Sequence, residues 1–377
     1  MICEPARDFH DRNNTYYLTI NMIRGLPMKV GIIGCGGIAP LHLRVYKNLN
    51  GVEIASLCDL NLARAQNLAS RFHVKNTYTD YLEMFRKEKL DLVDICTPVS
   101  THVQIVSDAA EAVPSILVEK PMALDLHGCD EIIRAVEKHG CKLCIGHNQI
   151  FSPHIQNAKS LIDTGQFDLY SFRTTLKASF ENLKSYNLAP PWNISPEQKG
   201  IIWEVCCHHA YLQLHFLPDI EQVYAVGCKV KYPVYDDFAV LLRTKEDRFG
   251  IIEISWIQRE TEVVYELKDT AGRRMQILWE FDCMLEYSQD PPFTVGLVAK
   301  NILVDEKRLL QRWAKFGTCY FQNKKLLPTA KMIATYLEAI RKDLPPPVTS
   351  VDGKKTISLL ECIEKSLRER KPISLAE

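Results

Sequence analysis

The pattern of apolar and polar positions changes near residue 148, which predicts two domains of different construction. Over residues 28–147, short apolar runs alternate with segments of helical periodicity, which is typical of a doubly wound parallel sheet in an α/β domain. Ser100 is expected to cap the third helix of this region, and Gly140 is expected to end the fourth. The predicted strands are 30–33, 52–57, 92–97, 116–119 and 142–146, and the predicted helices are 41–49, 61–72, 101–112 and 126–138.

From residue 148 onward, strand-like alternation dominates. Because strands follow one another without intervening helices, we expect an antiparallel sheet in an α+β domain over residues 148–377. Residues 1–27 are polar and are expected to be a disordered extension or an upstream start, and residues 278–325 receive no assignment. The predicted strands are 169–178, 222–230, 238–243, 250–256 and 262–268, and the predicted helices are 153–164, 200–216, 329–342 and 354–369.

The first predicted strand runs into a glycine-rich turn, Gly34-Cys-Gly-Gly-Ile-Ala39, which matches the pattern G-x-G-x-x-G/A. In this pattern, Gly34 allows the tight turn, Gly36 lets the backbone approach a diphosphate, and Ala39 lets helix and strand pack closely. The diphosphate is expected at the N-terminus of the next helix, where free N–H groups and the helix dipole favour negative charge. The order of strand, glycine turn and helix therefore predicts a Rossmann dinucleotide site.

An acidic residue ends the second predicted strand. Asp59 follows Gly34 by 25 positions (59 minus 34), near the roughly 20 expected for the acid that holds the adenosine ribose. Asp59 also suits the N-cap of helix 61–72, and both roles can hold together. A carboxylate here repels a 2′-phosphate, so we expect NAD as the cofactor, although Arg64 on the next helix leaves NADP open.

Composition narrows the classes of partner. The chain of 377 residues carries 46 basic and 46 acidic side chains, and this balance argues against nucleic acid or an anionic membrane as partner. No apolar stretch approaches the roughly 20 residues of a membrane-spanning helix. Thirteen scattered cysteines and the lack of an apolar signal-peptide core in residues 1–27 are typical of reduced thiols in a cytoplasmic protein.

Five motifs together resemble one known family. The sequence resembles the Gfo/Idh/MocA family (glucose–fructose oxidoreductase, inositol dehydrogenase and rhizopine catabolism) from Met28 to the C-terminal stretch 346–375. The resemblance implies a Rossmann domain over 28–147 and an open-faced antiparallel sheet domain over 148–377 for substrate binding and oligomerisation, as a dimer or tetramer. It also implies NAD(P)-linked oxidation or reduction of sugars, polyols and related alcohols. The motifs are KVGIIGCGGIA (29–39), CTPVSTH (96–102), VEKPMA (118–123), GHNQIFSP (146–153) and GIIWEVCCHH (200–209).

The resemblance also implies which residues contact the ligands. The cofactor-binding residues would be Gly34, Gly36, Gly37, Ile38, Ala39, Asp59, Thr97, Pro98, His102, Glu119, Lys120 and Asn148. The substrate-pocket residues would be His147, Gln149, Trp203 and Tyr211, although a core position is an equally good interpretation of Trp203 and of Trp192. The sequence departs from the family pattern in the substrate region: Glu204 and Tyr211 stand where aspartates are usual, and Ile150 stands where arginine is usual.

Hydride transfer from an alcohol needs a base for the hydroxyl proton and a group that stabilises the developing alkoxide. Lys120 follows a predicted strand at the crevice, so its ammonium is predicted to polarise the reacting oxygen, although most lysines after strands are simply solvated. His208 is predicted to be the general base because imidazole titrates near neutral pH. Glu204 is expected to orient His208 or to bind a substrate hydroxyl.

Helical spacing supports this grouping. Glu204, His208, Tyr211 and His215 fall on one stripe of helix 200–216, and an acid with two histidines is unusual for a face buried against a sheet. A satisfied core histidine is the simpler alternative for His208, and His209 is the second candidate base.

We also considered a metal site and other reaction classes. Consecutive helical residues such as 206–209 diverge, and Cys141 and Cys144 have no second cysteine pair, so we predict no metal site. Two alternatives to a net dehydrogenase remain: a glycosidase- or lyase-like enzyme that oxidises its substrate transiently with bound NAD, and a non-catalytic NAD-binding sensor.

Overall fold

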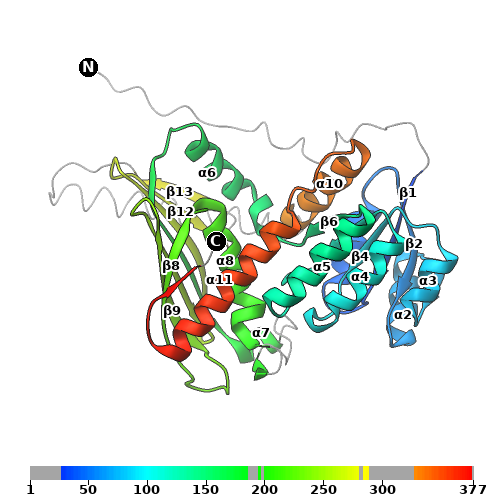
Figure 1. The fold of residues 1–377 in the computed structure, drawn as a ribbon, viewed down its shortest axis with the longest axis horizontal. Coiled ribbons are helices and arrows are strands. Elements are labelled where there is room, and N and C mark those ends of the chain that lie inside the picture. The colour runs from blue at the N-terminus through cyan, green and yellow to red at the C-terminus, as the bar shows by residue number, and fades with distance from the viewer. Residues whose placement is uncertain (1–26, 186–193, 197–198, 280–282, 288–326, 376–377) are drawn as a thin grey trace.

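The computed structural model describes residues 27–185, 194–196, 199–279, 283–287 and 327–375 (Figure 1). The predicted N-terminal extension up to residue 26, Trp192 and most of 278–325 lie outside these described residues. The remaining chain forms two sheet-based regions joined by helices. The first lies on the right of Figure 1 and the second on the left.

The first region is a six-stranded parallel sheet with the strand order β3-β2-β1-β4-β5-β6. All residues of β4 and β5 are buried, as expected for central parallel strands that are covered on both faces. Its elements are β1 (Met28–Ile33), α1 (Ala39–Lys47), β2 (Val52–Cys58), α2 (Leu62–Phe72), β3 (Asn76–Tyr78), α3 (Tyr81–Lys87), β4 (Leu92–Ile95), η1 (Val99–Thr101), α4 (His102–Ala112), β5 (Ser115–Val118), α5 (Leu126–His139) and β6 (Lys142–Ile145).

Helix ends in this region follow the local sequence, with two differences from prediction. Gly140 ends α5 in the left-handed conformation, as predicted. The cap of α2 is Asn61, whose side chain accepts from the N–H groups of residues 63 and 64, and not Asp59. Ser100 does not cap α4, because a 3₁₀ turn over Val99–Thr101 precedes the helix and moves its start to His102. Asp59 therefore does not cap α2.

The second region is an eight-stranded sheet with the order β13-β12-β11-β7-β10-β9-β8-β14. Its strands are antiparallel except for β7 and β10, which run parallel, so the sheet is mixed and mostly antiparallel. Its elements are η2 (Asn148–Phe151), α6 (Pro153–Asp163), β7 (Leu169–Ser179), α7 (Phe180–Ser185), η5 (Ile202–Cys206), α8 (Cys207–Phe216), β8 (Ile220–Cys228), β9 (Asp237–Thr244), β10 (Phe249–Ser255), β11 (Ile257–Asp269), β12 (Arg274–Leu278), β13 (Cys283–Tyr287), α10 (Leu327–Arg341), α11 (Ser350–Glu369) and β14 (Ile373–Ser374).

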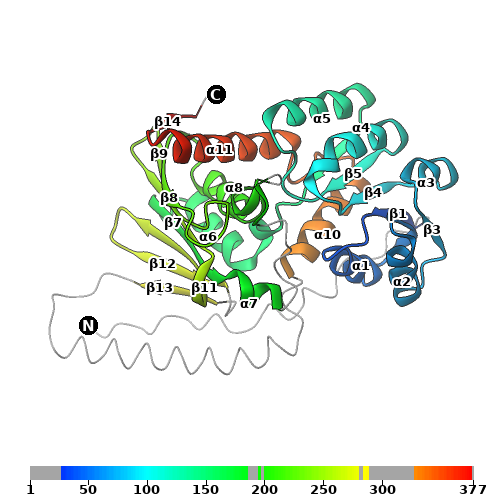
Figure 2. The ribbon, with the colours of Figure 1, turned by 90° about the horizontal axis from the view of Figure 1, so that it is seen from below.

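The two C-terminal helices hold the sheets together. α11 lies along one face of the eight-stranded sheet and reaches the first region beside α5 (Figure 2). A Cβ at Gly353 of α11 would lie 2.7 Å from the sulfur of Met122, so glycine permits this close approach. α10 packs on the parallel sheet, where the hydroxyl of Tyr336 donates to the carbonyls of Ile116 (3.0 Å) and Lys142 (2.7 Å). At the junction, α11 therefore contacts both regions and α10 packs on the parallel sheet.

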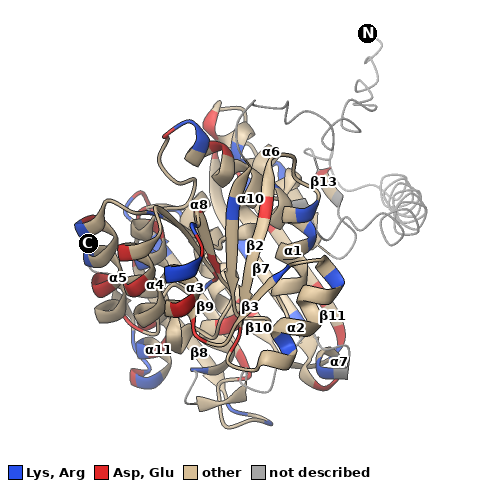
Figure 3. Cartoon of the chain, turned by 90° about the vertical axis from the view of Figure 1, so that its right-hand side faces the viewer, with Lys and Arg blue, Asp and Glu red and all other residues tan. Residues whose placement is uncertain are grey.

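The other face of the large sheet is more exposed. Along β9, every second residue is buried and the residues between are partly or fully exposed, which is typical of an antiparallel sheet covered on one side. Lysine, arginine, aspartate and glutamate positions are interspersed over the chain and do not gather by sign (Figure 3). In the described part of the chain, no helix is both long and apolar enough to cross a membrane.

Candidate active site at the junction of the two sheets

The glycine turn lies between the ends of three neighbouring strands. Gly34 has a φ of +93°, and a Cβ there would lie 2.7 Å from the carbonyl of Cys96, so only glycine fits. Its N–H donates to the carbonyl of Cys58 at 2.8 Å. Gly36 and Gly37 are exposed, and a Cβ on either would meet nothing within 4 Å. The turn therefore has no space for a side chain at Gly34, whereas Gly36 and Gly37 face open space.

The helix after the turn begins without a side-chain cap. Ile38 occupies the N-cap position of α1 and makes no capping hydrogen bond, and the first turn of α1 carries no acidic residue. Pro40 has no N–H, and the N–H groups of Leu41 and His42 donate to the carbonyl of Ile38, so the N–H groups that could meet an anion are those of the turn and of Ala39. Asp59 lies beside the turn, where its Oδ2 accepts from the N–H of Cys35 at 2.8 Å and its Oδ1 accepts from the N–H of Asn61.

Residues after β4 border the glycine turn. The methyl group of Thr97 would lie 2.9 Å from a Cβ at Gly34, and Pro98 is exposed next to it. His102 is fully buried, with Nδ1 at 2.9 Å from the carbonyl of Pro121 and Nε2 at 2.9 Å from that of Thr97. It therefore ties two loops together and turns no ring nitrogen toward an open site.

Lys120 follows β5 and reaches across the junction to the second region. Its Nζ donates to the carboxylate of Glu204 at 3.1 Å and to the backbone carbonyl of the same residue at 2.9 Å. Glu204 lies in η5, a π-helical turn that opens helix 200–216, and such turns are frequent at functional sites. Burial disfavours the charge, but the carboxylates of Glu204 and Glu119 outweigh it and raise the pKa of Lys120. The lysine is therefore an ammonium.

His208 lies one turn further along the helix and is oriented by Tyr211. Its Nδ1 is 2.8 Å from the hydroxyl of Tyr211, which also accepts from the N–H of Gln149 at 3.1 Å. Glu204 pairs with Lys120 and makes no contact of this kind with the imidazole. Burial, then the charge of Lys120 and the neighbouring histidines 209 and 147, hold the pKa of His208 well below its ordinary value of 6.5. His208 is therefore a neutral imidazole.

The segment after β6 supports this tyrosine. The ring of His147 stacks on that of Tyr211 at 4.3 Å between centroids. Asn148 accepts from the Tyr211 hydroxyl at 3.4 Å and donates to Thr329 of α10 at 3.1 Å. His147 is buried, and burial lowers its pKa to about 4. His147 and Asn148 therefore contact Tyr211, which in turn contacts His208.

The structure moves two predicted residues out of the site. Trp203 is fully buried, and its indole N–H donates to the carbonyl of Ala123, so it offers no face to a sugar and its placement in the substrate pocket is wrong. His215 lies near Lys159 and Asp163 of α6, away from the other members of the predicted stripe. The π-helical turn η5 ends at Cys206, so it changes the spacing between Glu204 and His208, whereas His208, Tyr211 and His215 all lie in the regular helix α8. His209 is also buried and faces the ring of Tyr265.

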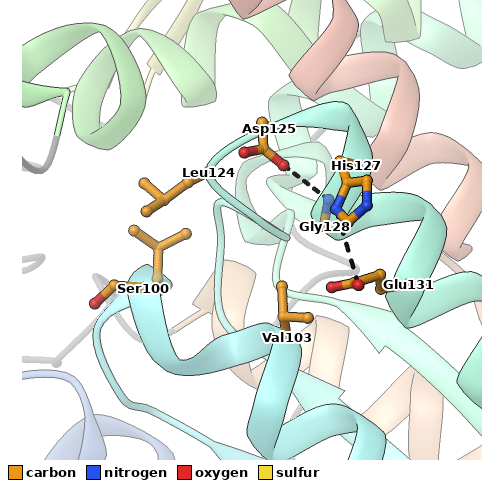
Figure 4. A pocket seen from close by; sticks show the side chains of 8 residues that line it. Ser100, Val103, Leu124, Asp125, His127, Gly128 and Glu131 are labelled. Carbon is orange, nitrogen blue, oxygen red and sulfur yellow. Dashed lines mark hydrogen bonds and ion pairs between the residues drawn. The ribbon is translucent and has the colours of Figure 1, made fainter.

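A separate pocket of about 210 Å³ lies between the start of α4 and the start of α5 (Figure 4). Its lining includes Ser100, Leu124 and Asp125, and the Asp125 carboxylate accepts from the N–H of Gly128 at the start of α5. None of Lys120, Glu204 and His208 lines it. Since it is shallow and open, it is not the site described above.

Sequence reasoning missed a buried cluster beneath Lys120. His42, Asp94 and Cys96 have ligand-type atoms within 4.8 Å of one another, and His42 also approaches Glu119. The sequence contained one indication of this cluster. A histidine in the first turn of a helix and an aspartate inside a buried strand are both unfavourable unless they are paired.

The fold and the Lys120–Glu204–His208 cluster define a two-domain dinucleotide-binding oxidoreductase. Residues 28–147 match the oxidoreductase family with an NAD-binding Rossmann fold, and residues 155–278 match the GFO/IDH/MocA C-terminal domain. The chain therefore belongs to the Gfo/Idh/MocA family of NAD-dependent oxidoreductases, and the predicted family is confirmed.

Relatives and solved structures agree with this assignment. The chain is 23% identical to the myo-inositol 2-dehydrogenase of Thermotoga maritima, over 93% of this chain and 99% of the relative. The WlbA dehydrogenase from Bordetella pertussis, in complex with NADH and UDP-GlcNAcA, has a TM-score of 0.77 at 17% identity, over 94% of this chain and 100% of that one. The scyllo-inositol dehydrogenase from Lactobacillus casei, with bound NAD(H) and scyllo-inositol, has a TM-score of 0.72 at 16% identity, over 93% and 100%.

Proposed function

We propose that this protein is an NAD-dependent dehydrogenase that oxidises a secondary hydroxyl group of a sugar, an inositol or a similar polyol. The observation that carries the proposal is the pairing of Lys120, which follows β5, with Glu204 of η5, close enough to His208 for the charge of Lys120 to lower the pKa of that imidazole. The inositol and nucleotide-sugar ligands of the relatives favour a substrate rich in hydroxyl groups.

The residues around the glycine turn fit the cofactor. The uncapped N-terminus of α1 and the exposed Gly36 and Gly37 leave room and N–H donors for a diphosphate. The Asp59 carboxylate would accept from the ribose hydroxyls and would repel a 2′-phosphate, which favours NAD. When bound, NAD supplies the hydride acceptor.

Lys120 and His208 would both act on the substrate oxygen, one as a hydrogen-bond donor and the other as a base. The Lys120 ammonium would donate a hydrogen bond to the reacting oxygen and stabilise the negative charge that develops on it. The neutral His208 would accept the hydroxyl proton on Nε2, while Tyr211 holds Nδ1. The substrate would thus lose one proton to His208 and one hydride to the cofactor, which leaves a ketone.

The experiment is a screen of inositols, aldoses and sugar acids with NAD, in which NADH and oxidised product are measured together. We expect NADH to form in step with product. Product that forms with no accumulation of NADH would contradict a net dehydrogenase and favour transient oxidation.

Variants test the assigned residues on any substrate that the screen finds. Lys120→Ala and His208→Ala should abolish turnover and leave NAD binding intact by calorimetry. Lys142→Ala is the matched control, since Lys142 begins the neighbouring strand β6 and pairs with Asp343 at 2.6 Å, away from the site. Full turnover in either site variant would refute the proposed mechanism.

A further inference from the structure

A chain of alternating charges runs through the core of the first domain to Lys120. His42 in the first turn of α1 lies with Nδ1 at 2.7 Å from Oδ2 of Asp94, and with Nε2 at 3.2 Å from Oε1 of Glu119. His42 and Asp94 are fully buried, and Glu119 is nearly so. Glu119 in turn accepts from the backbone N–H of Lys120, whose ammonium is bonded to Glu204.

Two carboxylates lie at the imidazole of His42. Nδ1 is hydrogen-bonded to Oδ2 of Asp94, while Nε2 lies 3.2 Å from Oε1 of Glu119 as an ion-pair contact without hydrogen-bond geometry. Two carboxylates this close, in a region without solvent, favour the charged form of the ring. Burial disfavours that charge, but Asp94 outweighs it and raises the pKa of His42 well above its ordinary value.

A metal ion is a poorer interpretation of the same cluster. Oδ2 of Asp94 already accepts from His42 and from the hydroxyl of Tyr46, at 2.7 and 2.9 Å. Binding a metal would require loss of the proton on His42 Nδ1 and displacement of Tyr46. The thiol of Cys96 is also fully buried, and burial and Asp94 raise its pKa, so the thiolate that a metal needs is disfavoured.

We infer that His42 is a positioning residue for Lys120: its imidazolium, held by Asp94, keeps the Glu119 carboxylate ionised, and Glu119 and Glu204 together keep Lys120 charged and in place. Glycine at position 146 leaves room for the Glu119 carboxylate, because a Cβ there would lie 3.2 Å from its Oε1. The inference rests on the proposed function of Lys120, and it assigns a function to His42 and Asp94, which are fully buried.

Other titratable groups face this chain and belong in any pH experiment. They are Tyr46 on the same helix, Cys96 beyond β4, Tyr336 of α10 near Tyr46, His102 and His147 near Glu119, and Cys207 near Lys120. Burial raises the pKa values of the tyrosines and cysteines and lowers those of His102 and His147. The tyrosines, the cysteines and His147 are therefore uncharged near neutral pH. Both ring nitrogens of His102 face carbonyl oxygens, so the charge of His102 is read in the same experiment as that of His42.

The first test reads the charge of His42 without using activity. Histidine side chains of the full-length protein, labelled with ¹⁵N, are followed by NMR at about pH 8.5, where a histidine with an ordinary pKa is neutral. We expect an imidazolium signal that persists at this pH and disappears in His42→Asn. A neutral His42 in the unmodified protein would overturn the inference, and this measurement does not depend on a variant that folds.

The second test compares Asp94→Asn with Tyr46→Phe. Asp94→Asn removes the charge that holds His42 protonated, so Glu119 should become protonated and Lys120 should lose one of its two carboxylates. An opposite charge within about 4–6 Å moves a pKa by about 1–3, so the alkaline limb of the kcat profile should fall by about one pH unit or more. Tyr46→Phe removes only a hydrogen bond to the same oxygen and should leave that limb in place.

The outcomes separate this inference from the proposed function. An unchanged alkaline limb in Asp94→Asn would overturn the inference, while inactive Lys120→Ala would still support the proposed function. Active Lys120→Ala would refute the proposed function whatever the charge of His42. In Asp94→Asn and Tyr46→Phe, the KM for NAD should stay the same, because Asp94 and Tyr46 are both fully buried.

Discussion

Replacing Glu204 with glutamine would remove one carboxylate beside Lys120 and keep the shape of the side chain. The lysine would retain the backbone carbonyl of residue 204 at 2.9 Å and the charge of Glu119. We therefore expect Lys120 to stay in position in Glu204→Gln. The change tests the charge of the pair and not its packing.

The structure sets the size of the effect. Nζ and Oε2 are 3.1 Å apart, and the two side chains are only 14% and 18% exposed, so solvent screens the pair weakly. A close opposite charge moves a pKa by about 1–3, or about 1.4–4 kcal/mol in favour of the protonated amine. Since the pKa of Lys120 starts above 10.5, the variant lysine should still be charged at neutral pH.

The assay is the pH dependence of kcat for Glu204→Gln with saturating NAD and substrate. We expect less than about a tenfold loss of kcat at neutral pH, and an alkaline limb that is lower by about 1–3 pH units. Glu364→Gln is the matched control, because Glu364 pairs with Lys199 at 3.5 Å and its loss should not move the limb. An unmoved limb in Glu204→Gln would refute the argument that this pair maintains the charge of Lys120.

Three further predictions concern the cofactor turn and acid stability. Gly34→Ala should abolish NAD binding by calorimetry and lower the melting temperature, because the new Cβ would clash with the carbonyl of Cys96; normal binding would contradict this. Asp59→Asn should raise kcat/KM for NADP relative to NAD by about tenfold or more, since it removes the repulsion of the 2′-phosphate; an unchanged ratio would count against Asp59 as the discriminating residue. His209 is buried, and burial lowers its pKa to about 3. The unfolded chain therefore takes up this proton first as pH falls below 6.5, and stability should drop by about 2 kcal/mol between pH 7 and pH 5 from this residue alone. Urea unfolding of His209→Leu at both values should show a loss smaller by that amount, and an equal loss would show that His209 is not responsible.

Local chemistry was sufficient to predict most of the first domain, although β3 and α3 were not predicted. Alternating apolar runs, the Gly34 turn and the terminal Asp59 are short-range features, and each element they predicted is present within a few residues of its expected bounds. Ser100 was placed wrongly because a 3₁₀ turn and an α-helix have the same local preferences. The parallel pairing of β7 and β10 was also beyond the sequence, because it joins strands that are far apart in the chain.

For the site, too, some features follow from the sequence and others only from the tertiary structure. The sequence by itself determined that Lys120 follows a buried strand and that Glu204, His208 and Tyr211 belong to one helix, because these facts depend only on spacing and periodicity. Only the tertiary structure decided that Glu204 pairs with Lys120, that Tyr211 orients His208, and that Trp203 is buried. It also joined His42 of α1, Asp94 inside β4 and Glu119 just after β5. Such contacts depend on how helices and strands pack across the two sheets, and pairing energies between buried charges exist only after that packing has excluded water.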